Sequence, residues 1–590
     1  MYIDIVPNRN SPPAVLLRES YREGKRVLKR TLANLSQWPA EIVEGLRILL
    51  RGGTAVEKLE DSFEIERSLP HGHVAAVLGT LRKLKLDTLI APEPSEGRDR
   101  VVAMIVARIL DPRSKLATAR GLDEETSTST LAEMLEMQET DAQALYTAMD
   151  WLGERQGEIE EKLAKRHLED GTLVLYDVSS TYFEGQCCPL GQRGHSRDGK
   201  KGKFILYLPE ALRPCNPGCR SCLASYATER GVRWPWRCLT GIRPIPRRSD
   251  PRLEKLRHRF KLSRVVLVGD RGMITEARIR DEIKPIEGLD WITALRAPAI
   301  RQLVEAGKIQ VSFFDERDLA EIQSPDYPGE RLIVCKNPLM AIRRAKKRQA
   351  LLEATERELN KIVAATQRSR RPLKGEAPIG LRVGKVLHRF KMAKHFRLDL
   401  REVGFSYARD EVKIAEEAAL DGIYVVRTSV QKAALDTEEA VRAYKDLGHV
   451  EQAFRSYKTI DLKVRPIYHY LVDRVCAHVF LCMLAYYVEW HMRQALAPLL
   501  FDDDERATAE AQRDSPVAPA KPSPSAQGKA RTLRTEDDFP VHSFQTLLAD
   551  LATIAKNRIR PKLPGADSFD QITRPTPLQR KAFDLLGVKL

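Results

Sequence analysis

Two aspartates that end strongly apolar segments are the residues of this sequence best placed to do chemistry. Asp177 follows the apolar run LVLY at residues 173–176, and Asp270 follows VVLVG at residues 265–269. Continuous apolar runs of this kind are typical of strands buried on both faces of an α/β core. Sites in open α/β sheets form outside the carboxyl ends of the strands, so we expect the two carboxylates to converge there. Divalent cations are their natural partners, because an unpaired carboxylate is costly to bury.

A third carboxylate, Glu451, lies on a predicted helix. Together with the two aspartates it could hold two divalent metal ions about 3.5–4 Å apart, which would activate water or a 3′-hydroxyl for attack on a phosphodiester. Two cations on the same helix would contact phosphate oxygens. At about 100° per residue, the spacing i, i+7, i+11 and i+14 places four side chains on one helical face, namely Tyr444, Glu451, Arg455 and Lys458.

Each of these residues also has an ordinary structural interpretation. An aspartate after an apolar strand is often only a turn or N-cap residue. A glutamate and an arginine four residues apart on a helix usually form a solvated salt bridge. The joint occurrence of three carboxylates on separate elements of one predicted core is what favours a metal site.

The bulk composition indicates a basic protein with several domains. The chain has 590 residues, of which 43% are apolar, enough for a sizeable core. Its net charge of +16 suits a polyanionic partner such as nucleic acid. The 9 cysteines lack a secreted disulfide framework, and the first ten residues lack a signal-peptide pattern. The most apolar predicted helix, residues 474–491, contains His478 and Glu489 and is not a clean membrane span. We therefore expect a cytoplasmic protein without a membrane partner.

Six divisions are predicted along the chain. An N-terminal region of short strands continues as a mainly helical part that could bind DNA. Two parts of an α/β core follow, separated by an insertion that contains strands. A segment rich in Ala, Pro and Ser predicts a disordered linker, and a helical tail ends the chain. The divisions are residues 1–165, 166–300, 301–430, 431–500, 501–540 and 541–590.

Individual elements follow from periodicity and from helix-boundary signals. Apolar residues at i, i+3 and i+4 predict helices, and short apolar runs predict strands. Asp111 and Pro112 predict a helix end, and Ser114 a new start. The predicted elements are helices over residues 40–50, 73–84, 99–109, 131–152, 339–366 and 542–557, strands within residues 1–35, and a strand over residues 422–426.

The three carboxylates stand in motifs that resemble those of DDE insertion-sequence transposases. The run YDVSSTYFEG at residues 176–185 looks like the first catalytic block, and GDRGM at residues 269–273 like the second. The run from Tyr444 to Lys458 is similar to the third and most specific signature, Y-x2-R-x3-E-x6-K. One position departs from it, because Leu447 stands where the pattern has arginine. Leucine cannot contact a phosphate electrostatically, so that task is redundant or falls to another cation.

The resemblance covers most of the chain and implies both a fold and an activity. The implied fold is of the α/β class, an RNase H-like mixed-sheet core interrupted by a β-containing insertion. The implied activity is cleavage of element ends and strand transfer with Mg²⁺, for which Mn²⁺ can substitute. The implied partner is double-stranded DNA, as terminal inverted repeats and target, bound by a homodimer in the bacterial cytoplasm and associated with the nucleoid. The expected site residues are Asp177, Asp270 and Glu451 as catalytic metal ligands, with Tyr444, Lys458, Arg455 and Arg271 at the DNA.

Residues 204–252 depart from the pattern of the surrounding core. They contain four of the 9 cysteines and many Pro and Arg residues, with almost no strand or helix period. Cys215, Cys219 and Cys222, with Cys238 as a fourth ligand, could bind zinc, although the second half lacks a closely paired ligand. We favour a shifted reading frame, because a one-base shift over residues 239–246 can restore FDGNTADP, which resembles a stretch between the two aspartate blocks of the family.

The altered segment has a consequence for activity. Proline cannot donate to a strand ladder, so the sheet that aligns Asp177 with Asp270 would lose its middle. A misplacement near 1 Å can cost about a hundredfold in rate, and we expect weak or absent activity from this copy. Three other functions stay open: an RNase H-like nuclease that cleaves without joining, a non-catalytic DNA-binding relic of a transposase, and a zinc-binding regulator.

Overall fold

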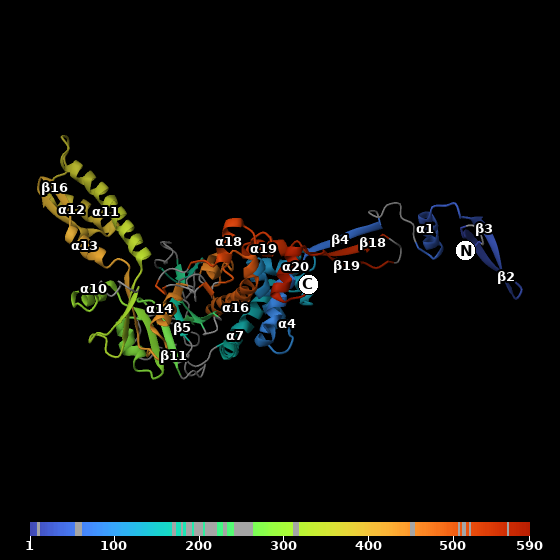
Figure 1. Ribbon diagram of the computed structural model, residues 1–590, viewed down its shortest axis with the longest axis horizontal. Helices are drawn as coiled ribbons and strands as arrows, with labels where there is room; N and C mark the ends of the chain where they lie inside the picture. The colour runs from blue at the N-terminus through green and yellow to red at the C-terminus, as the bar shows by residue number, and fades with distance from the viewer. Residues whose placement is uncertain are drawn as a thin grey trace.

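The structure, a computed structural model, is a mixed α/β protein of elongated shape (Figure 1). A central body lies between a projecting lobe at one end and a narrow arm that leads to the N-terminus at the other. For residues 174, 176–178, 181–183, 191–193, 204–206, 221–227, 233–240 and 459 the backbone alone is described. The described residues are 1–8, 12–53, 62–167, 173–178, 181–184, 191–193, 204–206, 221–227, 233–240, 264–310, 318–448, 455–505, 508–509, 515–517, 521–562 and 566–590.

The N-terminal unit is a three-stranded antiparallel sheet followed by one helix, which confirms the predicted strands and the helix over residues 40–50. Glu23 pairs with Arg26, so a two-residue turn joins the second and third strands. Gly24 in this turn has a φ of +60°, a conformation that glycine adopts without steric cost. The elements are β1 (Tyr2–Val6), β2 (Ala14–Glu23), β3 (Arg26–Asn34) and α1 (Ala40–Leu50).

Four long helices pack around one large apolar core in the central body. Helix α16 is apolar on all sides and mostly buried, as is typical of a helix at the centre of a folded body. In the described part of the chain, Val472–Leu499 is the one helical segment long and apolar enough to cross a membrane. Of the 18-residue apolar stretch within it, 78% is buried inside the protein. The four helices are α2 (Gly72–Lys83), α4 (Glu96–Leu110), α7 (Ala142–His167) and α16 (Val472–Leu496).

The helix predicted over residues 131–152 is wrong as a single element. It is divided into α6 (Leu131–Met134) and α7, because Glu136 has a φ of +50° and a left-handed residue ends a helix. The helix end predicted at Asp111 is confirmed, and Ser114 caps the next helix through its side chain. The shorter helices of this region are α3 (Leu86–Ile90) and α5 (Lys115–Leu122).

The C-terminal tail differs from the predicted helical tail. The helix expected over residues 542–557 is shorter, because strand β18 begins at Ala555 and pairs antiparallel with β4 from the N-terminal half. The local sequence of β18 has no strand period, so its conformation is set by the distant partner strand. Figure 1 shows this sheet as the narrow arm. The elements are β4 (Phe63–Pro70), α19 (Phe544–Leu551), β18 (Ala555–Pro561), β19 (Phe569–Ile572) and α20 (Pro577–Leu586).

The prediction of a disordered linker is wrong for part of residues 501–540. Helix α18 (Pro524–Thr532) lies there, and the side chain of Ser523 caps its N-terminus. Lys529 is buried, and its Nζ lies 2.7 Å from the Asp502 carbonyl oxygen and 3.1 Å from the Asp504 carboxylate. This anchoring orders a segment whose composition alone predicts disorder.

The central body also contains one eight-stranded mixed sheet. Its strand order is β10-β9-β5-β11-β12-β17-β14-β13. Strands β5, β11 and β12 are parallel to one another, and the other neighbours pair antiparallel. The strands are β5 (Leu173–Val178), β9 (Ser221–Ala227), β10 (Arg233–Thr240), β11 (Val265–Gly269), β12 (Leu289–Ala294), β13 (Leu319–Ile322), β14 (Arg331–Lys336) and β17 (Ile423–Thr428), with helices α9 (Glu276–Arg278), η3 (Ile279–Ile283), α10 (Ala297–Glu305) and α14 (Thr437–Lys445) beside them.

Strands β9 and β10 correct the expectation that residues 204–252 contain almost no strand. Strand β9 pairs with β5 over its whole length, and β10 pairs with β9 at the edge of the sheet. Pro235 lies in this edge strand, and the pairing is irregular between Pro235 and Cys238. An edge strand tolerates proline because one side of its ladder is unpaired. Three short strands form a separate small sheet, β6 (Thr181–Phe183), β8 (Phe204–Leu206) and β7 (Gly191–Arg193).

The segment between Asp270 and Tyr444 extends the sheet and also forms the projecting lobe. Strands β13, β14 and β17 continue the sheet beyond β12. The predicted charged helix over residues 339–366 and the strand over residues 422–426 are both confirmed, as α11 and β17. The lobe elements, seen at one end in Figure 1, are α11 (Pro338–Thr366), α12 (Glu376–Phe390), β15 (Phe396–Arg401), β16 (Gly404–Arg409) and α13 (Glu411–Ala419).

Candidate active site

The parallel pairing of β5 and β11 brings the two predicted aspartates to one level of the sheet. Gly269 pairs with Tyr176 in this register, and the next residues of the two strands are Asp270 and Asp177. Neighbouring strands lie about 4.8 Å apart, so the two backbones are close enough for their carboxylates to share ligands. The side chain of Asp177 lies outside the described atoms.

Asp270 fills the structural role that a residue after a strand often has. Its Oδ1 accepts hydrogen bonds from the backbone N–H of Gly272 at 2.7 Å and of Met273 at 2.8 Å. These two bonds fix the direction of the carboxylate. Its Oδ2 makes no hydrogen bond to any residue that the structure describes, so the turn role leaves one oxygen available to a ligand. The turn and the ligand interpretations of Asp270 are therefore compatible.

Tyr444 lies beside this carboxylate. It occupies the last turn of α14, which begins with a capping box between Asp436 and Glu439. Burial and, to a smaller extent, the charge of Asp270 raise the pKa of Tyr444 to about 12, and the charge of Arg271 opposes the shift. The phenol therefore stays protonated at neutral pH and can donate a hydrogen bond.

A cavity of about 480 Å³ joins these residues. Asp270, Arg271 and Tyr444 line it from the sheet side, and the first turns of α11 line it through Met340 and Arg344. The size suits a group such as a nucleotide unit, and the cations and the carboxylate meet at one wall. The sequence alone did not predict that α11 reaches the site, because the contact depends on tertiary packing.

Leu447 also lines this cavity, which explains its departure from the signature pattern. It packs against the apolar cluster of the sheet, among residues such as Val426 and Val441. The cavity lining includes Arg271 and Lys445, two cations that could take the place of the arginine that the pattern has at position 447. Lys445 Nζ, however, donates hydrogen bonds to the backbone carbonyls of Pro516 and Val517. Arg271 is exposed and is the better candidate for the missing cation.

The comparison with known proteins addresses the N-terminal unit. Residues 3–60 match the IS1634 family transposase, N-terminal domain. The match supports an insertion-sequence transposase. It covers the β1–β3 sheet and α1, and a transposase domain of this kind implies DNA as a binding partner. No curated protein matches the chain.

The remaining predicted site residues lie at or beyond the end of α14. Glu451 falls within residues 449–454, outside the described chain, so its place as a ligand stays a prediction. Arg455 is exposed and Lys458 is half-buried. Lys458 belongs to the π-helical turn η6 (Ser456–Ile460), which departs from the 3.6-residue period used to predict the shared face. Single π-helical turns occur frequently at functional sites.

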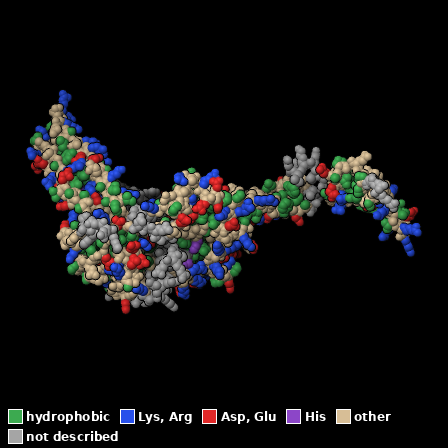
Figure 2. All heavy atoms as spheres, in the orientation of Figure 1, with side chains coloured by type: hydrophobic (Ala, Val, Ile, Leu, Met, Phe, Trp, Pro, Cys, Tyr) green, Lys and Arg blue, Asp and Glu red, His purple; other side chains and the backbone are tan. Residues whose placement is uncertain are grey.

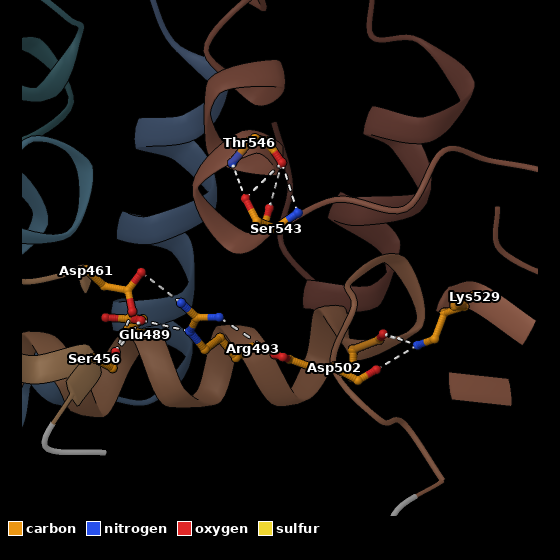
Figure 3. Close-up of polar contacts among 9 residues, drawn as sticks. Ser456, Asp461, Glu489, Arg493, Asp502, Lys529, Ser543 and Thr546 are labelled. Atoms are coloured by element: carbon orange, nitrogen blue, oxygen red, sulfur yellow. Dashed lines mark hydrogen bonds and ion pairs between the residues drawn. The ribbon is translucent and has the colours of Figure 1, made fainter. Parts of the chain in front are cut away.

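A buried ionic network holds the turn that follows Glu451 (Figure 3). Ser456 Oγ donates to Asp461 at 2.5 Å and to Glu489 at 3.3 Å. Arg493 pairs with Glu489 at 2.8 Å and with Asp461 at 3.0 Å. Burial raises the pKa of Glu489 to about 7, and the positive charge of Arg493 opposes this shift. A Glu–Arg pair at i, i+4 inside an apolar helix was the signal in the sequence that could have revealed this network.

The predicted metal sites involve atoms outside the described side chains. Among the side chains that the structure describes, no three His, Cys, Asp or Glu residues form a group that could hold a metal ion. The two-metal prediction needs the side chain of Asp177 and Glu451, both of which lie outside the part of the chain that the structure describes. The zinc prediction needs Cys215 and Cys219, which lie outside the described residues, as do the side chains of its other two cysteines.

Proposed function

We propose that this protein is a DDE transposase, which cleaves phosphodiester bonds at the ends of an insertion sequence and joins the freed strands to target DNA. The observation that carries the proposal is the parallel register of β5 and β11, because it sets Asp177 and Asp270 side by side at the carboxyl end of the sheet. Tyr444, from the third signature, lies next to Asp270. Two motifs far apart in the sequence thus meet at one cavity.

An RNase H-like core is supported by the order of the strands. After β5 the chain adds β9 and β10 on one side, where the second and third strands of such a core are expected, and β11 and β12 on the other. The three further strands beyond β12 come from the segment that the resemblance treats as an insertion. The sheet therefore accommodates both the core and its interruption.

Three carboxylates suit a hard divalent cation such as Mg²⁺, with Mn²⁺ as a substitute, because such ions prefer oxygen ligands. The Oδ2 of Asp270, which makes no hydrogen bond to the described residues, fits this role, and Asp177 and Glu451 would complete the set. A bound metal pair supplies Lewis-acid activation of the attacking and leaving oxygens. Around it, the Asp270 turn holds one ligand oxygen in place, and Arg271 neutralises a neighbouring phosphate. The protonated Tyr444 donates to a phosphate oxygen or to a base, while Arg455 and Lys458 contact the flanking backbone.

The proposed partner is double-stranded DNA, as inverted repeats and as target, bound by a homodimer in the bacterial cytoplasm and nucleoid. The net charge of +16 and the transposase N-terminal domain support a DNA partner. The composition of residues 204–252 supports the further proposal that this copy is impaired, since a reading-frame shift there would disturb the strands next to β5.

The test uses purified protein and a duplex that carries the DNA flanking its gene, with Mg²⁺ or Mn²⁺. We expect slow nicking at the element ends and joining to a target plasmid, both abolished by EDTA and by Asp270→Asn. Asp281→Asn is the matched control, since this exposed carboxylate, paired with Arg280, does not line the cavity. Cleavage without joining would indicate a nuclease instead. DNA binding without cleavage in either metal would indicate a non-catalytic relic.

A further inference from the structure

The projecting lobe holds most of the excess positive charge of the chain. Residues 338–390, which comprise α11, α12 and their connection, contain 14 Lys and Arg against 4 Asp and Glu, a net charge of +10, whereas the whole chain has +16. Figure 2 shows Lys and Arg side chains along this lobe. Neither the fold nor the proposed metal site requires such a concentration of like charges.

Five of these cations form a row along one face of α11, which we call the cationic stripe. Relative to Arg343 they occur at i+3, i+4, i+14 and i+18, and at about 100° per residue all lie within about 60° of one line. Ala350 and Ala354 lie on the same line between Lys347 and Arg357, and Glu358 lies at its edge, about 60° from Arg343. At 1.5 Å per residue the stripe is about 27 Å long. Its members are Arg343, Lys346, Lys347, Arg357 and Lys361.

The cationic stripe faces away from the interior of the lobe. The opposite face of α11 buries Leu352, Leu359 and Ile362 against α12 and the β15–β16 hairpin. All five stripe cations are exposed. Among the residues that the structure describes, four of them make no ion pair, and Lys361 pairs with Glu358 in an exposed contact.

Apart from Glu358, the acidic residues of the lobe that form ion pairs do so with cations outside the cationic stripe. Arg348, about 140° from Arg343 around the helix, pairs with Asp421, and Arg409 pairs with Glu356 at 2.7 Å. Like charges three and four residues apart repel one another. The cationic stripe is therefore a local cost to the helix, which a polyanion would relieve.

The cationic stripe begins beside the candidate active site. Met340 and Arg344, in the first turns of α11, line the cavity that Asp270 and Tyr444 also line. Residues 338–350 include no buried side chain, so a large partner can approach this part of the helix. From there α11 runs outward along the lobe (Figure 1). The direction of the stripe is thus from the site of chemistry toward the tip of the lobe.

We propose that the cationic stripe binds the phosphate backbone of the DNA duplex whose reacting phosphate occupies the cavity at Asp270. The proposal rests on the proposed function and adds a second contact surface to it. Duplex DNA advances 3.4 Å per base pair, so a stripe of about 27 Å would follow about eight base pairs. Contacts of Lys and Arg to phosphates fix position and register without reading sequence. The stripe would therefore hold flanking DNA and leave recognition of the element ends to other parts of the chain.

The test compares full-length variants for binding to a duplex of about 30 base pairs of arbitrary sequence, at several salt concentrations. The stripe variant carries Arg343→Gln, Lys346→Gln and Lys347→Gln. The control variant carries Lys308→Gln, Lys432→Gln and Lys589→Gln, three exposed cations that lie outside helices and strands in separate parts of the chain. Each lost phosphate contact lowers the slope of log K against log salt by about 0.9, so we expect the stripe variant to lose about 2.7 and the control variant much less.

The melting temperature of the stripe variant should be unchanged or higher, because the substituted side chains are exposed and mutually repulsive. Wild-type binding that neither variant alters, or that both alter equally, overturns the role of the cationic stripe and leaves the proposed function intact. Failure of the wild-type chain to bind or cut any DNA overturns the proposed function, and the stripe proposal with it. A stripe variant with reduced affinity for an acidic protein but not for DNA also overturns the proposal.

Discussion

Asp270 accepts two backbone hydrogen bonds from the turn that ends at Met273, and the same carboxylate stands at the strand position beside Asp177. One side chain thus closes a turn through Oδ1 and also belongs to the lining of the cavity. Asp270 can therefore serve both as a turn residue and as a metal ligand, because a carboxylate has two oxygens.

Substitutions of Asp270 separate these two purposes. Asp270→Asn keeps a carbonyl oxygen for the Gly272 and Met273 N–H groups, so we expect the free energy of unfolding to change by less than about 0.5 kcal/mol. Asp270→Ala removes the acceptor and should cost about 1 kcal/mol, as for a lost cap. Both should abolish cleavage. Urea denaturation and a nicking assay measure the two effects, and equal stability of both variants would contradict the turn role.

Gly272→Ala tests how closely the carboxylate must be placed. A Cβ at this position would lie 3.1 Å from Asp270 Oδ1, so the carboxylate must shift by a few tenths of an ångström. Since a misplacement of 1 Å costs about a hundredfold in rate, we expect cleavage to fall by roughly tenfold with little change in melting temperature. Gly121→Ala, whose Cβ would lie 3.1 Å from the Thr128 hydroxyl, is a control with similar crowding at a residue that does not line the cavity. An unchanged rate in Gly272→Ala would contradict the placement.

Arg493→Met tests the buried network under the turn that carries Lys458. The substitution leaves Glu489 and Asp461 buried without their cation, and breaking a buried pair in this way costs about 3–5 kcal/mol. We expect a large fall in the urea midpoint at pH 8. The double variant Arg493→Met with Glu489→Gln should recover part of it, and no recovery would contradict the assigned pairing.

Stability should fall on the acid side because buried histidines resist protonation. Burial and, to a smaller extent, nearby cations lower the pKa of His469 and of His491 to about 4. A folded-state pKa below the ordinary value of 6.5 gives stability that is present above about pH 6.5 and is lost as the pH falls toward 4. Melting temperatures measured between pH 7 and pH 4 check this loss, and His491→Gln should reduce its slope.

Glu489 acts in the opposite direction. The pKa of Glu489 in the folded state, about 7, lies above its ordinary value of 4.5. Its contribution to the free energy of unfolding is therefore present below about pH 4.5 and is lost as the pH rises through 7. Glu489→Gln should therefore raise the relative stability at pH 8 compared with pH 5. A pH profile identical to that of the wild-type chain would show that Arg493 keeps the glutamate ionised throughout.

Much of this arrangement could be predicted from local sequence, and the parts that could not depend on distant contacts. The apolar runs before Asp177 and Asp270 predict two buried parallel strands, and the structure pairs them. The helix over residues 339–366 follows from its period and its cap. By contrast, β18 replaces the end of the helix predicted over residues 542–557, because β4 provides the backbone hydrogen bonds of a partner strand. Helix α18 is ordered because the buried Lys529 donates hydrogen bonds to backbone carbonyls.

The candidate site shows the same division. Spacing predicts that Tyr444 belongs near the carboxylates, and the structure sets it beside Asp270. The approach of α11 to the cavity could not be predicted, because nothing in residues 338–350 encodes contact with a strand end some seventy positions earlier. Strands β9 and β10 were also missed, since pairing with β5 overrides a sequence rich in proline and arginine.

The pairing of β4 with β18 delays the completion of folding during synthesis, because the two strands lie far apart in the sequence. Residues 63–70 leave the ribosome long before residues 555–561 are made. At about 5–20 residues per second, the first strand waits roughly 25–100 s for its partner. During that interval the arm between the N-terminal domain and the body cannot form. We expect a polypeptide that terminates before Ala555 to leave β4 without its partner strand, so the arm assembles only after residues 555–561 are translated.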